Sequence, residues 1–217
     1  MIKIENKIGV FGAGGFGKET MSYLIDCLAN SNQKIEEVAV FVVDDQWYTK
    51  NTVMGIPVIP RSEFSVKGYE ILIAVGDPSD RRKIIESLPA DTRYFTLIHP
   101  SAIISKFVEI GEGAIITPGT IVTCDIKIGK HAHLNLHTTV GHDCIIGDYF
   151  TTAPGVHISG SCTIDDGVYF GTNSSVREKI NICKNVTIGM GAVVVKDITE
   201  AGIYIGSPAK RLERKKN

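Results

Sequence analysis

Residues 110–147 read IGEGAIITPGTIVTCDIKIGKHAHLNLHTTVGHDCIIG, and an aliphatic residue returns in this segment at every sixth position. The register extends to both sides, and its members are Ile104, Ile110, Ile116, Val122, Ile128, Leu134, Val140, Ile146, Thr152, Ile158, Ile164, Phe170, Val176, Ile182, Ile188 and Val194. All of them except Thr152 are apolar. A period of six fits neither an amphipathic helix nor an alternating strand, and it is typical of hexapeptide β-helix repeats. A β-sandwich is the alternative interpretation of this apolar pattern.

A second set of positions follows four residues after each member of the first. These residues are mostly small or apolar, and they include Val108, Ala114, Ala132, Thr138, Cys144, Val156, Cys162, Val168, Val186 and Ala192. We expect both sets to point inward. Glycine also recurs at Gly111, Gly129 and Gly147, where the chain turns a corner and a Cβ atom would be crowded. Three hexads then make one coil, and roughly five coils stacked about 4.8 Å apart bury a shared core.

The first hundred residues follow another pattern, in which short apolar runs alternate with helical stretches. We expect strands at residues 7–11, 38–43 and 70–75 and helices at residues 18–27 and 80–88. This alternation is typical of a small, Rossmann-like βαβαβ unit with a parallel sheet. Between the first strand and the first helix, residues 12–17 read GAGGFG. The spacing G-x-G-x-x-G lets backbone N–H groups approach a phosphate at a helix N-terminus.

The candidate substrate-binding residues of this half lie where its strands end. They are Gly12, Gly14, Gly15 and Phe16 in the glycine turn, Asp44 and Asp45 after the second strand, and Gly76 after the third. A dinucleotide fold needs two mononucleotide halves, and there is room for only one before the repeats. We therefore expect a mononucleotide such as a nucleotide sugar, with Asp44 or Asp45 bonded to its base or ribose. In the alternative interpretation, the glycines only make a tight turn and both aspartates are solvated.

Bulk composition narrows the class of protein. The net charge of −1 provides no basic field for nucleic acid. No apolar run reaches the length of a membrane span, and residues 1–6 lack the features of a signal peptide, so we expect a cytoplasmic protein without membrane insertion. The five cysteines contain no C-x-x-C pair, which argues against a disulfide framework and a structural zinc site.

With these motifs the chain resembles the hexapeptide-repeat family of sialic acid O-acetyltransferases and nucleotide-aminosugar N-acetyltransferases, the group containing PglD and the perosamine N-acetyltransferases. The matching segments span essentially the whole chain, and they are GAGGFG, VVDD, VGD, IHPSA, NLHTTVGHDCIIGD, IGMGAVVVKD and GSPAKR. The resemblance implies a left-handed β-helix at residues 99–217 after a nucleotide-sugar-binding domain at residues 1–98. It also implies a homotrimer with acetyl-CoA in a groove between neighbouring β-helices. From the residues themselves we expect no metal.

The resemblance also implies roles for individual residues. His142 takes the place of the general base and is followed by Asp143, while Asn135 matches an asparagine near the acceptor. The residues that match positions lining the acetyl-CoA groove are Thr151, Gly160, Thr172, Gly189 and Met190. Thr151 stands where many relatives carry a second histidine, and Phe16 stands where PglD-like members carry a histidine in the glycine turn.

The chemistry expected of His142 follows from its residue type. A neutral imidazole can take the proton of an attacking nucleophile near neutral pH, and Asp143 can hold the ring in the required tautomer. The transfer then needs no acyl-enzyme, because Cys144 and Cys162 lie in the inward set. The alternative interpretation of His142 is an exposed surface histidine. We expect the remaining histidines of the repeats, which are His131, His133, His137 and His157, on the outer face.

The expected function is acetyl-CoA-dependent N-acetylation of a 4-amino-4,6-dideoxyhexose carried on dTDP, UDP or GDP, for O-antigen or glycan biosynthesis. Acetylation of a hydroxyl on a sialic acid or another sugar is the alternative within the same enzyme class. A γ-type carbonic anhydrase would bind zinc through His137 and His142, but its third ligand would fall on Ser101. A non-catalytic trimeric scaffold is the last alternative.

Overall fold

The computed structural model describes residues 4–29 and 31–213. The chain forms two compact units, residues 1–100 and residues 101–217. No helix within the described ranges is long and apolar enough to cross a membrane.

The first unit is built on a five-stranded sheet in the order β3-β4-β2-β1-β5. Its strands are β1 (Lys7–Phe11), β2 (Ala39–Val43), β3 (Thr52–Val53), β4 (Ile56–Pro60) and β5 (Tyr69–Ile73). All neighbouring strands are parallel except β3, which is antiparallel to β4. The chain places β2 and β4 on one side of β1 and then β5 on the other, so the strand order reverses at β1. In open α/β sheets, ligands bind beyond the carboxyl ends of the strands at such a reversal.

Helices and short turns connect these strands. They are α1 (Gly15–Leu28), α2 (Ile35–Val38), the 3-10 turns η1 (Asp45–Trp47) and η2 (Arg61–Glu63), and α3 (Pro78–Glu86). The short strand β6 (Leu97–Ile98) follows α3 and is not part of this sheet. Phe11, Val42 and Ile73 point to the same face of the sheet, where Ile84 and Ile85 of α3 pack against them. The first residues of α3 are tied down because the Asp77 carboxylate accepts hydrogen bonds from the N–H groups of Ser79 and Asp80.

The predicted α/β unit is confirmed, with differences at its edges. The helix α1 starts at Gly15, three residues earlier than expected, so the end of the glycine motif forms its first turn. The strand β4 was not predicted, because Pro57 and Pro60 weaken a strand signal. It forms nevertheless, since Ile56 and Val58 are buried on one face while Pro57 is exposed.

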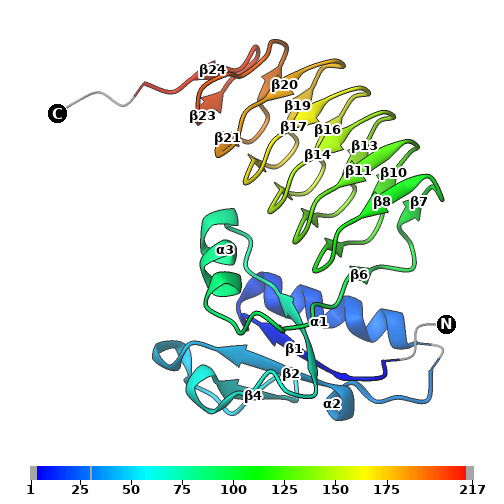
Figure 1. Ribbon diagram of the computed structural model, residues 1–217, viewed down its shortest axis with the longest axis vertical. Coiled ribbons are helices and arrows are strands. Elements are labelled where there is room, and N and C mark those ends of the chain that lie inside the picture. Colours follow the sequence, from blue (N-terminus) through cyan, green and yellow to red (C-terminus); the bar gives the residue numbers. More distant parts are fainter. Residues whose placement is uncertain (1–3, 30, 214–217) are drawn as a thin grey trace. The chain divides into compact units, whose positions relative to one another are not determined.

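The second unit is a left-handed parallel β-helix with three faces (Figure 1). The hexapeptide register predicted the stacked coils, and the family resemblance implied the left hand. Face 1 consists of β7 (Ile103–Ile104), β10 (Ile121–Val122), β13 (Thr139–Val140), β16 (His157–Ile158), β19 (Ser175–Val176) and β22 (Val193–Val194). Face 2 consists of β8 (Val108–Ile110), β11 (Ile126–Ile128), β14 (Ile145–Ile146), β17 (Thr163–Ile164) and β20 (Asn181–Ile182). Face 3 contains β9 (Ile115–Ile116), β12 (His133–Leu134), β15 (Thr151–Thr152), β18 (Tyr169–Phe170), β21 (Val186–Ile188), β23 (Gly202–Ile205) and β24 (Lys210–Arg211).

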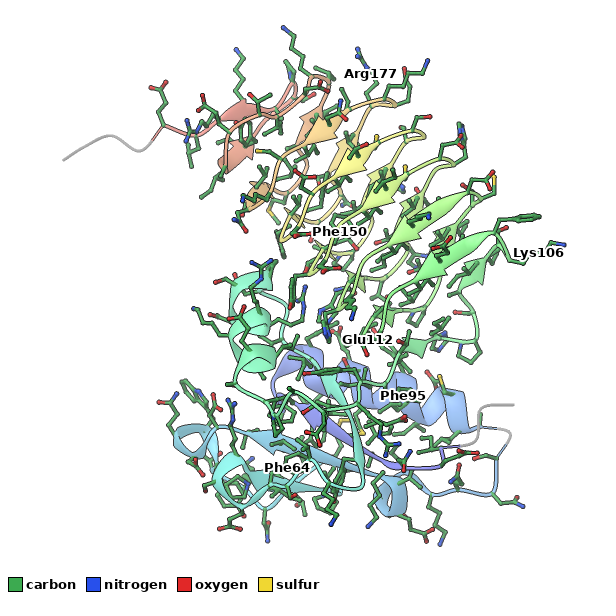
Figure 2. All side chains as sticks on the ribbon, in the orientation of Figure 1. Phe64, Phe95, Lys106, Glu112, Phe150 and Arg177 are labelled. Carbon is green, nitrogen blue, oxygen red and sulfur yellow. The ribbon has the colours of Figure 1, made fainter. Side chains whose placement is uncertain are left out.

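Neighbouring coils pair in register at a spacing of one full coil. Ile121 of β10, for example, pairs with Ile103 in the coil before it and with Thr139 in the coil after it. The side chains of the inward sets fill the interior. One of them is Phe150, which is labelled in Figure 2, and its ring meets the Phe170 ring edge to face with 5.9 Å between centroids. Each fully buried aliphatic side chain contributes about 1.5–3 kcal/mol relative to exposure, so the stack of coils is held by its core.

The corners of the coils show why glycine recurs in this sequence. A Cβ atom on Gly111 would lie 2.6 Å from the backbone of Gly129 in the next coil, and one on Gly129 would lie 2.5 Å from Gly147. Two residues after these glycines, each corner places one residue in the left-handed region, with φ between +55° and +73°. These residues recur every six positions, at Gly113, Gly119, Asp125, His131, His137, Asp143, Tyr149, Gly155, Ser161, Gly167, Asn173, Lys179, Asn185 and Gly191. Asp143 of the candidate site is one of them.

Candidate active site

His142 lies at the corner between β13 and β14, and its side chain is 63 % exposed. Its Nδ1 atom lies 2.6 Å from Oδ2 of Asp143. A carboxylate at this distance accepts the Nδ1–H, so the neutral ring carries its lone pair on Nε2. The pair therefore has the arrangement of a general base that is oriented by its neighbour.

Gly160 lies one coil further along the same edge, directly against the His142 ring. A Cβ atom on Gly160 would lie 2.7 Å from Nε2 and 2.8 Å from Cε1 of the imidazole. The backbone of the two coils is joined here, because Ser161 N–H donates to the carbonyl oxygen of His142 at 2.7 Å. The absence of a side chain at residue 160 therefore leaves the space that the imidazole occupies.

The other predicted residues of the β-helix lie on different edges of the coils. His142, Asp143 and Gly160 lie on the edge between face 1 and face 2, which we call the histidine edge. The edge between face 3 and face 1, which we call the asparagine edge, carries Asn135, Thr172, Gly189 and Met190. Thr151 is buried at the start of β15 in face 3. Within one chain, the strands of face 1 separate the histidine edge from the asparagine edge.

Two expectations about the histidines were wrong. His131 and His133 are buried rather than placed on an open outer face, and the His131 ring stacks on Tyr149 with 5.6 Å between centroids. The sequence pattern places both residues outside the two inward sets, but it does not show how closely a side chain packs on the neighbouring coil. The His131 ring, for example, lies against the Cα of Gly113. His137 and His157 are exposed, and His157 Nδ1 lies 2.9 Å from Thr139 Oγ1.

The cysteines near the histidine edge are buried in the core. Cys144 and Cys162 occupy the same inward position in consecutive coils. A hydrogen bond with Cys162 and burial both raise the pKa of the Cys144 thiol. Cys144 therefore stays protonated and does not provide a nucleophile beside His142.

In the first unit, a cavity of about 650 Å³ opens at the carboxyl ends of the parallel strands. Its lining residues are Phe11, Gly12, Ala13, Gly14, Val42, Val43, Asp44, Trp47, Thr49, Lys50, Val53, Val58, Arg61, Val75, Asp80, Lys83 and Ile84. This volume is in the range of small-molecule sites, which are mostly apolar with a few polar groups. Gly12, Gly14 and Asp44 were predicted from the sequence, whereas Gly15, Phe16, Asp45 and Gly76 lie outside the lining.

The glycines of the turn have separate physical roles. Gly12 has φ +102°, and its N–H donates to the carbonyl oxygen of Val42 at 2.8 Å. Gly17 packs so closely on the carbonyl group of Gly12 that no side chain fits between them. A Cβ atom on Gly14 or Gly15, in contrast, would meet nothing within 4 Å. The space in front of these two residues is therefore open at the N-terminus of α1.

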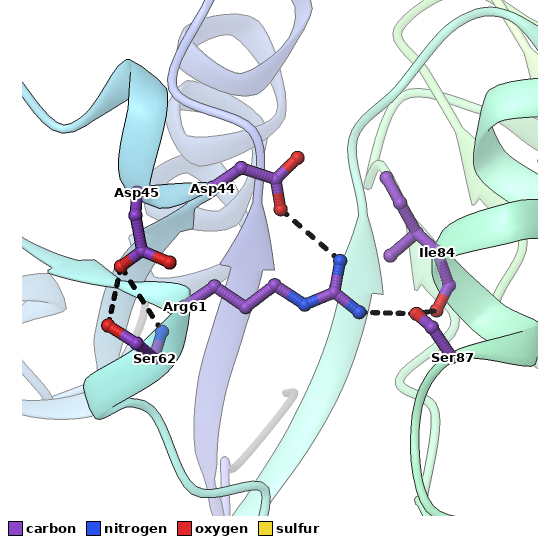
Figure 3. A network of polar contacts seen from close by, with 6 residues as sticks. All are labelled: Asp44, Asp45, Arg61, Ser62, Ile84 and Ser87. Atoms are coloured by element: carbon purple, nitrogen blue, oxygen red, sulfur yellow. Dashed lines mark hydrogen bonds and ion pairs between the residues drawn. The ribbon is translucent and has the colours of Figure 1, made fainter.

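The two aspartates that follow β2 have different partners (Figure 3). Asp44 Oδ1 accepts a hydrogen bond from Arg61 Nη1 at 3.2 Å. Asp45 Oδ1 accepts instead from Ser62 Oγ at 2.5 Å and from Ser62 N–H at 3.4 Å. The hydrogen bond from the Ser62 hydroxyl holds the pKa of the Asp45 carboxyl below its usual value. Oδ1 of Asp45 is therefore occupied by hydrogen bonds from Ser62 of the same chain.

Sequence reasoning missed several residues of the cavity, above all Trp47, Lys50, Arg61 and Lys83. Arg61 was missed because it directly follows β4, a strand that the sequence did not predict. Trp47 is the single tryptophan of the chain and is 68 % exposed, which was a signal available in the sequence for an aromatic contact surface. In the part of the chain that the structure describes, no group of three or more His, Cys, Asp or Glu side chains is placed to hold a metal ion.

Comparison with known proteins gives consistent results for both units. Residues 7–88 match the family model of the PglD N-terminal domain. The chain is 32 % identical to the GDP-perosamine N-acetyltransferase of Escherichia coli O157:H7, in an alignment that covers 96 % of this chain and 97 % of that protein.

Solved structures extend the similarity to the whole fold. The acetyltransferase domain of PglB from Neisseria gonorrhoeae FA1090, in complex with acetyl coenzyme A, has 32 % identity and a TM-score of 0.85, covering 95 % of this chain and 99 % of that one. PerB from Caulobacter crescentus, in complex with CoA and GDP-perosamine, has 25 % identity and a TM-score of 0.84, covering 96 % and 98 %.

Proposed function

Because this chain belongs to the family of hexapeptide-repeat sugar acetyltransferases that includes GDP-perosamine N-acetyltransferase, we propose that it acetylates the 4-amino group of a nucleotide-linked 4-amino-4,6-dideoxyhexose with acetyl-CoA. The observation that carries the proposal is the 2.6 Å contact between His142 Nδ1 and Asp143 Oδ2 on an exposed edge of the β-helix. It supports a base whose neutral ring carries its lone pair on Nε2, on a side chain that is 63 % exposed.

His142 acts as the general base of the transfer. As the sugar amine attacks the acetyl carbonyl carbon, Nε2 takes the proton that the amine loses, and the negative charge of Asp143 stabilises the resulting imidazolium. The new N–C bond forms, the C–S bond of the thioester breaks, and the proton passes to the departing thiolate. The protein forms no covalent intermediate.

We further propose that the active form is a homotrimer. The predicted acceptor and CoA residues are divided between the histidine edge and the asparagine edge, which a single chain holds apart. A cyclic trimer around an axis along the β-helices brings the histidine edge of each protomer to the asparagine edge of the next. This arrangement assembles one complete site in each groove.

The cavity of the first unit is the proposed nucleotide site, with its glycine turn facing the diphosphate. We place the reaction in the cytoplasm, because the chain carries five free cysteines, which persist in a reducing compartment.

The substitution His142→Ala tests the proposed base. We expect kcat to fall by at least about a hundredfold while the melting temperature stays unchanged, since the side chain is exposed and contributes little packing. The assay follows acetyl-CoA consumption with GDP- and UDP-linked 4-amino-4,6-dideoxyhexoses, and mass spectrometry distinguishes an acetylated amine from an acetylated hydroxyl. His157→Ala, another exposed histidine of the β-helix, serves as the matched control. Near wild-type turnover of His142→Ala would refute the assignment.

A further inference from the structure

Thr152 is the single polar residue in the inward hexapeptide register, and its side chain is completely buried. A hydroxyl in an apolar core destabilises the fold unless it is hydrogen-bonded. Residues that break an otherwise regular pattern tend to lie at functional sites, where stability is given up for another purpose. The partners of this hydroxyl therefore indicate why the register is broken here.

The Thr152 hydroxyl has two partners in the preceding coil, and both lie at the asparagine edge. Its Oγ1 atom accepts a hydrogen bond from the N–H of Asn135 at 2.8 Å. The same atom lies 2.7 Å from Oγ1 of Thr138, which is also completely buried. A hydroxyl can donate one hydrogen bond and accept two, so these contacts satisfy it within the core.

The bond to Asn135 replaces one step of the regular backbone ladder. In the neighbouring coils, the residue at the same place is Thr117 or Ala153, and its N–H donates to a backbone carbonyl oxygen of the next coil at 3.0 or 2.7 Å. The N–H of Asn135 donates to the side chain of Thr152 instead. Of the residues that the structure describes, β12 and β15 pair at one position, whereas β9 and β12 pair at two. The backbone at Asn135 therefore departs from the regular repeat.

Further contacts fix Asn135 in this position. Its carbonyl oxygen accepts from the N–H of Thr138 at 3.0 Å and from Oγ1 of Thr120 at 3.4 Å. Its side-chain Oδ1 accepts from the N–H of Leu136 at 2.8 Å. Because Oδ1 is directed at the backbone, Nδ2 is the group that an oxygen atom of a ligand can approach.

We propose that Thr152 is a positioning residue for the acceptor sugar, because its hydroxyl takes the place of a backbone acceptor and so determines where Asn135 presents Nδ2 to an oxygen of the sugar. The inference rests on the proposed function, since Asn135 is one of the residues assigned to the acceptor. An aliphatic residue at position 152 lets the ladder close in the regular way, with the N–H of Asn135 on the carbonyl oxygen of residue 152. The asparagine then moves away from the sugar.

Two variants of Thr152 separate the hydroxyl from the methyl group. Thr152→Val removes the hydroxyl, and we expect the KM of the acceptor to rise about tenfold while kcat and the KM of acetyl-CoA stay within about twofold, as for the loss of one hydrogen bond to a bound substrate. Thr152→Ser keeps the hydroxyl and should retain the acceptor KM within about twofold. The assay uses whichever GDP- or UDP-linked 4-amino-4,6-dideoxyhexose the unsubstituted protein acetylates faster.

Thr117→Val is the matched control for these kinetics. It also removes a completely buried threonine hydroxyl, at the same corner of the preceding coil, but that hydroxyl has no hydrogen-bond partner among the described residues. We expect the acceptor KM of this variant to be unchanged. A rise equal to that of Thr152→Val would assign the effect to the packing of the corner and overturn the proposal.

Thermal unfolding provides the readout that a purely structural threonine would not give. We expect the melting temperature of Thr152→Val to equal or exceed that of the unsubstituted protein, because an aliphatic residue fits the register. Thr152→Ser should unfold at a lower temperature, because it leaves a methyl-sized cavity. The more stable variant is thus the one that binds the acceptor poorly. If acceptor KM instead worsens as the melting temperature falls, Thr152 serves only the fold.

A crystal structure of Thr152→Val tests the movement of Asn135 without an activity assay. We expect the N–H of Asn135 to bond to the carbonyl oxygen of residue 152. An acceptor KM that rises while Asn135 stays in place overturns the inference. An unchanged acceptor KM also overturns it and leaves the proposed function standing. Absence of acetyl transfer in the unsubstituted protein overturns the proposed function itself, and the acceptor role of Thr152 with it.

Discussion

At the scale of single residues, the candidate base depends on a residue that has no side chain. The Asp143 carboxylate orients His142 from one side, and the bare Cα of Gly160 leaves room for the ring on the other. Because the clash that a methyl group would cause is with the end of a rotatable side chain, the ring can move aside without disturbing the coil. A substitution at residue 160 should therefore reduce catalysis more than it reduces the stability of the fold.

Gly160→Ala is the corresponding prediction. We expect kcat to fall by about tenfold to a hundredfold because the displaced imidazole no longer meets the amine, while the melting temperature changes little. Steady-state kinetics and thermal unfolding measure the two effects. Gly167→Ala, at a corner between face 2 and face 3 and away from both proposed edges, is the control for a general effect of replacing glycine in a coil. A Cβ atom there would likewise meet the end of a side chain, Asn185 Oδ1 at 2.8 Å, and its φ of +66° adds backbone strain. Unchanged kcat in Gly160→Ala would show that the ring is not held where the structure places it.

At the scale of elements, neighbouring side chains within a strand of the β-helix lie on opposite sides of the sheet. In β14, Ile146 is 2 % exposed and points into the core, whereas its neighbour Ile145 is 57 % exposed. Both are isoleucines in the same two-residue strand, so they differ only in the side of the sheet on which they lie. The stability of the stack depends on the inward residue.

Ile146→Ala and Ile145→Ala form a matched pair that tests this dependence. We expect Ile146→Ala to lower the free energy of unfolding by about 2–5 kcal/mol, because it leaves a cavity between coils, and Ile145→Ala to change it by about 0.5 kcal/mol or less. Chemical denaturation with circular dichroism measures both. Equal effects would contradict the inward assignment of the hexapeptide register; a large effect of Ile145→Ala alone would indicate that face 2 is covered in the oligomer.

At the scale of the whole molecule, the proposed site needs two protomers. The histidine edge carries the base, and the asparagine edge carries Asn135, whose side-chain oxygen accepts from Leu136 N–H at 2.8 Å and leaves its amide N–H groups for a ligand. Neither edge alone carries all the residues that were predicted to contact the acceptor and acetyl-CoA. Two inactive proteins with defects on different edges should therefore complement each other.

Mixed trimers of His142→Ala and Asn135→Ala are the test of this arrangement. Since a groove is intact only when the histidine and the asparagine both come from unsubstituted edges, random mixing at equal ratio restores about a quarter of the sites. Each variant is assayed alone, then after the two are unfolded and refolded together, with sedimentation velocity to verify the trimer. Activity that stays at the level of the separate variants would place both residues in a site within one chain.

Much of this protein is determined by its sequence alone. The period of six from Ile104 to Val194 predicted the β-helix, because only stacked coils bury an aliphatic residue at every sixth position. The glycine turn between a strand and a helix predicted the α/β unit and the end of the sheet at which its cavity opens. The family resemblance seen in the motifs is confirmed by the relative that is 32 % identical over nearly the whole chain.

Only the tertiary structure decided which side chains meet. The bond between Asp44 and Arg61 joins residues seventeen positions apart, and one of them follows a strand whose prolines concealed it. Gly160 lies against His142, and His131 is buried, through contacts between coils that are eighteen residues apart. The physical reason is the same in each case: periodicity is a property along the chain and is visible in the order of residues, whereas a contact between segments depends on how their backbones pack in space.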